Sequence, residues 1–342
     1  MKKICVIYTG GTIGSAYRGD GCVGTDGGAG GTLTAMYKEK YGTEAEFVEC
    51  RPLDVLSENM QKNDLVCLAD CLREKLRGEY AGVVVTHGTD TLSFTAPLFA
   101  LLFCDARLPV VFVSALYPLA DERSNGPDNF AAAVDFIGEG LPGVFVAFRN
   151  AGESFARIHL ASRLSDCAPV TGDFSSFGGV PFGVWSDGKF KYLADPVNPT
   201  ADELRAERAP CGLTAQDLCT DILTVKAHSL TDYSLYGLSA KKPRAVVLEL
   251  YHSGTICTAG GGNAANFLRL CREKGVPAVL SPVLRGGNVY ESATELAALA
   301  EIFYDESFQM SRVKAMLALG AGMPLKDVSE RNFFFEKVAP RA

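Results

Sequence analysis

The stretch ICVIYTGGTIG, residues 4–14, joins a buried strand to a glycine turn. Its apolar half, residues 4–8, is typical of a strand inside a parallel sheet. Its second half carries Thr9 and Thr12 between glycines, which let the backbone approach a ligand closely. Ligands of such sheets bind beyond the carboxyl ends of the strands, so this turn predicts a functional site.

Apolar runs of the same kind alternate with amphipathic helical patterns through the first half of the chain. This order predicts an α/β fold with a mostly parallel sheet flanked by helices. Asp64 is expected to cap the helix that follows it. The predicted strands cover residues 4–8, 82–86, 109–114 and 144–148, and the predicted helices cover 64–76, 91–102 and 129–137.

A polar segment with three prolines, residues 194–218, predicts a linker between two domains. The N-terminal domain would then cover residues 1–193, and a smaller α/β domain would cover residues 219–342. In the smaller domain we expect strands at 222–227, 245–251 and 278–282 and helices at 264–274, 293–302 and 311–319.

The composition restricts the class of protein. The chain has 342 residues, of which 47% are hydrophobic and 21% charged, as in soluble globular proteins. Its formal net charge of −7 argues against a nucleic-acid-binding surface. The 11 cysteines are scattered, so we expect reduced thiols, and neither they nor the 4 histidines show metal-ligand spacing. Apolar runs are too short for a membrane span or a signal peptide, so a cytoplasmic protein is expected.

The second predicted strand ends in HGTDT, residues 87–91. Threonine is a weak nucleophile unless a base accepts its proton, and Asp90 is a carboxylate beside Thr89. Thr12 and Thr89 therefore stand at corresponding strand ends, a pattern that fits an acyl-transfer site. Threonines in glycine turns also cap helices or bind phosphate, and the sequence leaves that alternative open. His87 either lines the site or makes a structural hydrogen bond.

Two motifs, YTGGTIGS at residues 8–15 and THGTDT at residues 86–91, resemble those of the bacterial-type L-asparaginases, type I cytoplasmic branch. The resemblance spans nearly the whole chain. It implies a larger N-terminal domain with a mostly parallel sheet flanked by helices and a smaller C-terminal α/β domain. Four further stretches are similar to the family: SENM at 57–60, ALYPLADERSNGPDN at 115–129, LYHSGT at 250–255 and PVLRGG at 282–287.

The resemblance also implies a reaction, the hydrolysis of L-asparagine to L-aspartate and ammonia without a metal or an organic cofactor. Thr12 would be the nucleophile, and Thr89 and Asp90 would belong to a second triad, with Asp90 also holding the substrate α-amino group. A homodimer or homotetramer is implied, in which a neighbouring chain completes the pocket. The implied substrate-binding residues are Gly11, Ser57, Glu58, Gly88, Ala115 and, from the neighbouring chain, Thr255.

Two positions depart from the family pattern. Where the family has a lysine partner for the aspartate, the best match is Arg163, which keeps the positive charge but cannot act as a neutral amine base. The family also has a tyrosine ten residues after the nucleophile. Here Cys22 occupies that position, and Tyr17 is the one nearby residue with a phenol group. We expect Arg163 and either Tyr17 or Cys22 to act in altered supporting roles, the latter two in a mobile glycine-rich lid.

Two other functions stay open because of these departures. One is an amidohydrolase that acts on glutamine or another amino-acid amide. The other is a weakly active or non-catalytic homologue that binds an amino acid. In each case the expected partner is a small amino acid, and neither a nucleic acid nor a membrane.

Overall fold

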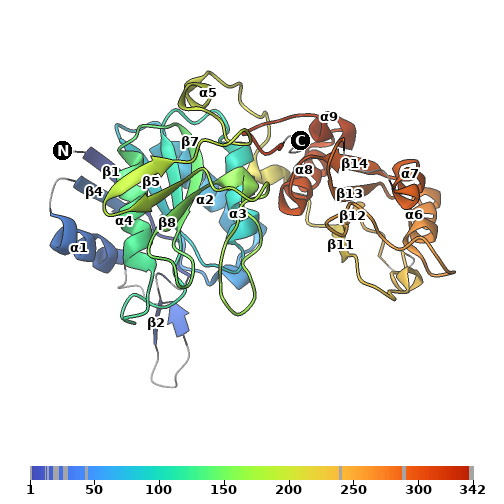
Figure 1. Ribbon diagram of the computed structural model, residues 1–342, viewed down its shortest axis with the longest axis horizontal. Helices are drawn as coiled ribbons and strands as arrows, with labels where there is room; N and C mark the ends of the chain where they lie inside the picture. Colours follow the sequence, from blue (N-terminus) through green and yellow to red (C-terminus); the bar gives the residue numbers. More distant parts are fainter. Residues whose placement is uncertain are drawn as a thin grey trace. The chain divides into compact units, whose positions relative to one another are not determined.

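The computed structural model describes residues 2–11, 13, 15–17, 23–25, 30–42, 45–238, 241–286 and 290–338 (Figure 1). The chain divides into two compact units. Unit 1 contains Met1–Ala215 together with Phe333–Phe335, and unit 2 contains Gln216–Asn332 together with Glu336–Ala342.

Unit 1 is built on a mixed sheet with the strand order β10-β9-β8-β7-β6-β5-β1-β4. The strands from β4 to β7 are parallel, and those from β7 to β10 pair antiparallel. Every residue of β5, β6 and β7 is buried, because helices cover both faces. The strands are β1 (Lys2–Ile7), β4 (Ala45–Cys50), β5 (Gly82–Thr86), β6 (Pro109–Val113), β7 (Gly143–Phe148), β8 (Ala156–Leu160), β9 (Gly183–Ser186) and β10 (Lys189–Tyr192).

Two of the covering helices, α3 (Leu92–Leu102) and α4 (Gly126–Ile137), lie on opposite faces of this sheet (Figure 1). Phe112 of β6 packs edge-on against Phe99 of α3 at 5.5 Å, and Phe145 of β7 packs against Phe136 of α4 at 4.7 Å. Phe145 lies beside Val111 in the ladder, one residue away from Phe112. Side chains at neighbouring positions along a strand point to opposite faces of the sheet, so Phe112 and Phe145 point to opposite faces. The helices that they contact, α3 and α4, therefore cover opposite faces.

Helix α1 (Gly30–Tyr41) shares the face of α4, since Tyr37 of α1 and Phe47 of β4 both contact Phe130 of α4. In the sheet order, the chain moves from β1 to β4 in one direction and from β6 to β7 in the other. Because α1 and α4 lie on the same face, the β1–α1–β4 and β6–α4–β7 crossovers have opposite handedness. The β5–α3–β6 connection has the hand of the first. Because nearly all such crossovers are right-handed, we assign β6–α4–β7 as the left-handed one.

This arrangement predicts where a ligand binds. After β1 and after β6 the chain continues into α1 and α4, which lie on one face of the sheet. After β5, the strand between them, it continues into α3 on the other face. A crevice forms beyond the carboxyl ends of adjacent strands whose connections diverge in this way. The turns after β1, β5 and β6 meet at such positions.

The strands predicted for the N-terminal half are confirmed, with shifts of one or two residues at their ends. The assignment of Asp64 as a helix cap is wrong. Helix α2 (Lys62–Lys75) is capped by Gln61, and Asp64 is the third residue of the helix, where its Oδ2 completes a capping box by accepting from the Gln61 backbone N–H at 2.8 Å. The residue three positions inside the helix supplies the carboxylate of such a box.

Unit 2 holds a parallel sheet with the order β11-β12-β13-β14. A helix was predicted at 293–302, but α7 (Glu291–Ala297) ends earlier and β14 (Glu301–Tyr304) begins inside that range. The sheet places β14 beside β13, a pairing that local pattern does not reveal. The other elements are β11 (Ile222–Lys226), β12 (Ala245–Glu249), β13 (Ala278–Val283), α6 (Ala264–Glu273), α8 (Phe308–Ala321) and α9 (Leu325–Ser329).

Smaller elements complete the described chain. The glycine-rich stretch after the first turn contains an antiparallel hairpin of β2 (Ser15–Tyr17) and β3 (Val23–Thr25). A short helix, α5 (Ala201–Arg205), lies in the segment predicted as a linker. Within the described residues, none of the helices combines the length and the apolar character that a membrane crossing needs.

Candidate active site

The first glycine turn is tied to the next strand by Thr9. Its hydroxyl donates to the backbone carbonyl of Thr86 at 2.6 Å, and Thr9 is buried. This bond fixes the end of β1 against the end of β5. Thr12, the expected nucleophile, lies outside the described residues.

Three expected site residues, Gly11, Gly88 and Ser57, converge with no room between them. A Cβ on Gly11 would lie 2.5 Å from the backbone nitrogen of Gly88. A Cβ on Gly88 would lie 2.4 Å from Oγ of Ser57. Gly11 also adopts a φ of 75°, in the left-handed region that favours glycine. The glycines are therefore required by close packing of the turns after β1 and β5 against the segment that contains Ser57.

The segment before Ser57 is held to the first turn by backbone hydrogen bonds. The Val55 N–H donates to the Thr9 carbonyl at 2.9 Å, and the Gly11 N–H donates to the Val55 carbonyl at 3.1 Å. Ser57 opens a short 3-10 helix, Ser57–Asn59, and Thr91 Oγ1 donates to its carbonyl at 3.0 Å. Ser57 is buried, whereas Glu58 beside it is exposed.

The buried side chain of His87 is hydrogen-bonded to the backbone of the second turn, the one after β5. Its side chain is fully buried, and burial lowers its pKa to about 4, so the ring is neutral. Nδ1 lies 2.8 Å from the Gly88 carbonyl, to which a neutral ring donates its N–H. Of the two roles left open by the sequence, this geometry favours the structural hydrogen bond. Thr89 is half-buried and Asp90 is exposed at the rim above it.

The third turn, after β6, is fixed by two buried asparagines that the sequence did not single out. Oδ1 of Asn125 accepts from the Leu116 N–H at 2.8 Å, directly after Ala115, which is buried. Nδ2 of Asn129 donates to the Ser114 carbonyl at 2.8 Å. Both belong to the start of α4, and their spacing of four residues was the available signal, because it places two amides on one side of a helix.

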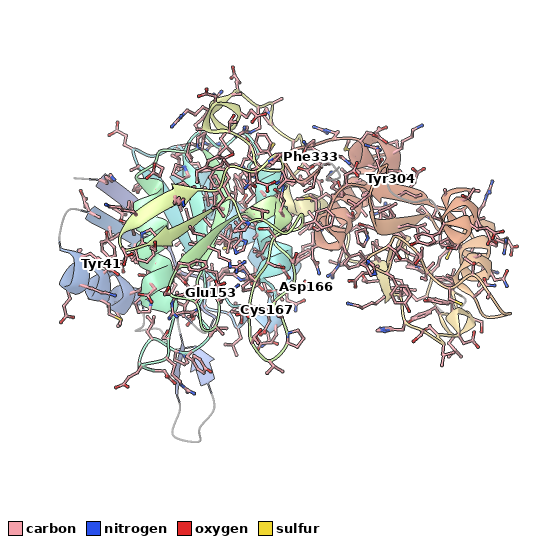
Figure 2. The ribbon with its side chains drawn as sticks, in the orientation of Figure 1. Tyr41, Glu153, Asp166, Cys167, Tyr304 and Phe333 are labelled. Atoms are coloured by element: carbon pink, nitrogen blue, oxygen red, sulfur yellow. The ribbon has the colours of Figure 1, made fainter. Side chains whose placement is uncertain are left out.

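A loop of acidic residues lies near Asp90. Burial raises the pKa of the Cys167 thiol to about 11, and the charges of Asp90, Asp173 and Asp166 act in the same direction. Asp166 and Cys167 are labelled in Figure 2. Asp166 accepts from Ser93 Oγ at 2.7 Å, which ties this loop to the first turn of α3. The cluster makes the surroundings of Asp90 favourable for a cationic group such as an ammonium.

Arg163 is buried and its guanidinium donates to the backbone carbonyls of Val197 and Phe335. These bonds give it an anchoring role within unit 1, and its expected partnership with Asp90 stays a prediction. The backbone of Tyr17 lies in β2, opposite Val23, while its side chain and Cys22 lie outside the described part of the chain. Thr255 belongs to unit 2, where its Oγ1 lies 2.9 Å from Ser253 Oγ.

The site thus consists of backbone turns, hydroxyl groups and carboxylates. No group of three or more His, Cys, Asp or Glu among the described residues is placed to hold a metal ion. Glycine turns that converge at a switch point of a parallel sheet define a class of α/β proteins that bind small polar ligands beyond the strand ends.

The family is settled by comparison with known proteins. The family described as "Asparaginase, N-terminal" matches residues 3–198, and the chain belongs to this asparaginase family. An L-asparaginase of Thermococcus kodakarensis is 31% identical over 163 residues, 48% of this chain and 47% of that protein. A component of the glutamyl-tRNA(Gln) amidotransferase of Thermoplasma acidophilum is 30% identical over 200 residues, 57% of this chain and 47% of that protein. The matched region spans about half the length of these curated relatives.

Solved structures agree on the fold. The thermostable L-asparaginase from Thermococcus kodakarensis superposes with a TM-score of 0.80 at 24% identity, covering 99% of this chain and 100% of that chain. A probable cytoplasmic L-asparaginase from Campylobacter jejuni superposes with a TM-score of 0.72 at 23% identity, covering 98% and 100%. The family match and the named relatives support an enzyme of the amidohydrolase class.

Proposed function

We propose that this protein hydrolyses the side-chain amide of L-asparagine to L-aspartate and ammonia. The observation that carries the proposal is the convergence of Gly11, Gly88 and Ser57 without intervening side chains. It brings the turn that precedes Thr12 against the turn that precedes Thr89. Together with the family match, it supports a threonine nucleophile at the first turn.

In this proposal the Thr12 hydroxyl attacks the amide carbon, ammonia leaves, and water then hydrolyses the resulting ester. Thr89 and Asp90 form the second triad, with Arg163 and Tyr17 in supporting roles. Backbone N–H groups near Thr89 and Ala115 bind the oxyanion, the arrangement that stabilises developing charge in acyl transfer. Ser57 and Glu58 hold the amino-acid end of the substrate, and the acidic rim around Asp90 favours its α-ammonium group.

The proposal extends to the organisation of the protein. The catalytic domain covers residues 1–193, a linker covers 194–218 and the second domain covers 219–342. The protein acts in the cytoplasm as a homodimer or homotetramer, in which Thr255 of a neighbouring chain completes the pocket. Sedimentation of the purified chain would test the assembly.

The direct test is ammonia release from L-asparagine by the wild type, Thr12→Ala and Thr12→Ser. We expect Thr12→Ala to lose on the order of 10³-fold or more in kcat. Thr12→Ser keeps a hydroxyl and should keep measurable turnover, while circular dichroism checks that both variants fold. Activity of Thr12→Ala equal to that of the wild type would show that Thr12 is not the nucleophile.

A second candidate function is hydrolysis of glutamine or another amino-acid amide. It is favoured by the similarity to an amidotransferase component and by Arg163 in place of the family lysine. Comparing kcat/KM for asparagine, glutamine and D-asparagine decides between the two. Calorimetry that finds tight aspartate binding without any ammonia release would point instead to a non-catalytic binding protein.

A further inference from the structure

Three thiols, those of Cys5, Cys50 and Cys71, lie close together on β1, β4 and α2. Cys50 is the last residue of β4, and Cys71 lies on α2. Their sulfurs are 3.8 Å apart, and both side chains are partly exposed. The sulfur of Cys5 on β1, which is fully buried, accepts a hydrogen bond from Cys50.

We propose that Cys50 and Cys71 form an oxidation site, where a hydroperoxide joins them in a disulfide that closes the loop containing Ser57. A disulfide needs its sulfurs about 2 Å apart, so the two thiols must approach by roughly another 2 Å. Adjustment of the two side chains supplies this approach, because one thiol ends a strand, the other lies on a helix, and both are partly exposed.

The chemistry is a two-electron oxidation of the two thiols. Two S–H bonds are lost and one S–S bond forms, while the O–O bond of hydrogen peroxide breaks and two waters leave. The attacking species is a thiolate, formed when the partly exposed Cys50 thiol gives its proton to a base in solution. The hydrogen bond between Cys5 and Cys50 lowers the pKa of Cys5, whereas that same bond raises the pKa of Cys50 to about 11. We therefore expect oxidation to be faster at pH 9 than at pH 7.

The disulfide would act on the loop that it encloses. Cys50 and Cys71 are 21 positions apart, and the chain between them carries Val55, Ser57 and Glu58. Val55 is hydrogen-bonded to the turn after β1, and the Tyr8 N–H donates to the Cys50 carbonyl at 2.9 Å. A disulfide between Cys50 and Cys71 therefore constrains both ends of the segment that contains Ser57, the residue that packs against Gly88. The effect on substrate binding rests on the proposed function, but the disulfide itself does not.

The test maps thiols in the full chain after hydrogen peroxide treatment. Peptide mass spectrometry without reductant should show a Cys50–Cys71 crosslink that reduction removes. The crosslink should be absent in Cys71→Ser and present in Cys67→Ser, a matched control for the exposed thiol one turn earlier on α2. If Cys71→Ser fails to fold, Cys50→Ala serves the same purpose. Oxygen addition at Cys67 alone, or a Cys5–Cys50 crosslink in place of the expected one, would overturn the assignment.

Two functional readouts follow. Oxidation should raise the thermal midpoint of the wild type and of Cys67→Ser by about 5 °C, and leave that of Cys71→Ser unchanged. In the asparaginase assay, oxidation should change KM several-fold with the same pattern across variants. If the protein proves not to hydrolyse asparagine, the crosslink map and the midpoint still decide the oxidation site. A mapped crosslink with unchanged KM in an active enzyme would overturn its coupling to the loop.

Discussion

At the scale of single residues, the site is defined by absent side chains as much as by present ones. Gly11 and Gly88 permit two turns and a serine to occupy a volume that any Cβ would fill. The hydroxyl groups and carboxylates of the motifs gain their positions from this packing. A substitution at either glycine therefore tests the geometry without removing a reactive group.

Gly88→Ala is expected to lower kcat/KM for asparagine by on the order of 100-fold. The new Cβ would lie 2.4 Å from Ser57 Oγ, so Ser57 must move away from the turn. Steady-state kinetics measure the loss. Gly261→Ala is the control, since no atom lies within 4 Å of the added methyl, and its kinetics should match those of the wild type. Wild-type kinetics in Gly88→Ala would contradict the packing described for the turn.

Buried histidine makes stability depend on pH. Burial, with a contribution from Arg157, lowers the pKa of His159 from 6.5 to about 3. Below pH 6.5 the unfolded chain binds a proton that the folded chain does not, so stability is full above this pH and falls as the pH drops toward 3. At pH 4 this residue alone lowers the free energy of unfolding by about 3 kcal/mol.

Urea unfolding at pH 7 and pH 4 measures this effect. His159→Asn should lose about 3 kcal/mol less than the wild type between the two values. His228→Asn, which changes an exposed histidine, should follow the wild type. An unchanged pH dependence in His159→Asn would show that this ring is not the group responsible.

At the scale of elements, the start of α4 organises the third turn of the site. The left-handed β6–α4–β7 connection brings the helix to the face opposite α3. Asn125 and Asn129 then reach back to the backbone at Leu116 and Ser114. The helix therefore fixes a turn that contributes to the proposed oxyanion site.

Asn125→Ala should destabilise the protein by about 2 kcal/mol, because it leaves the half-buried Leu116 N–H and Arg149 carbonyl without this partner. We also expect kcat to fall by roughly tenfold as the turn at Ala115 relaxes. Asn266→Ala is the matched control, since its amide is exposed and bonds only locally, donating to the Gly261 carbonyl and accepting from Arg269. Equal unfolding midpoints in the two variants would contradict the assigned role of Asn125.

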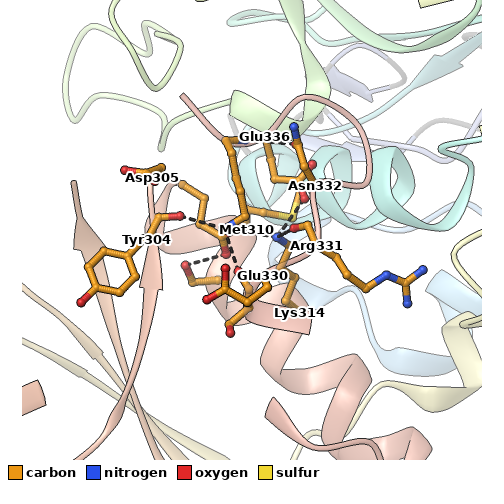
Figure 3. A network of polar contacts seen from close by, with 12 residues as sticks. Tyr304, Asp305, Met310, Lys314, Glu330, Arg331, Asn332 and Glu336 are labelled. Carbon is orange, nitrogen blue, oxygen red and sulfur yellow. Dashed lines mark hydrogen bonds and ion pairs between the residues drawn. The ribbon is translucent and has the colours of Figure 1, made fainter. Parts of the chain in front are cut away.

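At the scale of the whole molecule, residues near the end of the chain are built into both units. Phe334 is fully buried in unit 1, where its ring packs 6.1 Å from Phe145. Two residues later Glu336 joins a buried ion network of unit 2 (Figure 3). Lys314 there lies 2.5 Å from Glu306 and 2.8 Å from Glu336, all three fully buried. Burial lowers the pKa of Lys314, but the charges of Glu336 and Glu306 outweigh it and the net pKa is raised.

Lys314→Met should lower the free energy of unfolding by about 3–5 kcal/mol, since two buried carboxylates lose the charge of Lys314 and Glu306 keeps only the longer ion pair with Lys337 at 3.4 Å. Lys241→Met, which removes an exposed ion pair with Asp221, should change it by less than about 1 kcal/mol. Adding Glu306→Gln to Lys314→Met should recover part of the loss. Equal stability of the two lysine variants in urea would contradict the cost assigned to the buried network.

The α/β class, seven of the fourteen strands of the described chain and the two glycine turns could be predicted from the sequence, because these depend on local periodicity and on motifs within a few residues. The left-handed connection, β14, the asparagines of the third turn and the meeting of Gly88 with Ser57 emerged only from the folded chain. Folding also brought Cys50 to Cys71 and tied Arg163 to the carbonyl of Phe335, 172 positions away. Each of these depends on contacts between residues distant in the chain, and neither periodicity nor spacing records which distant residues come together.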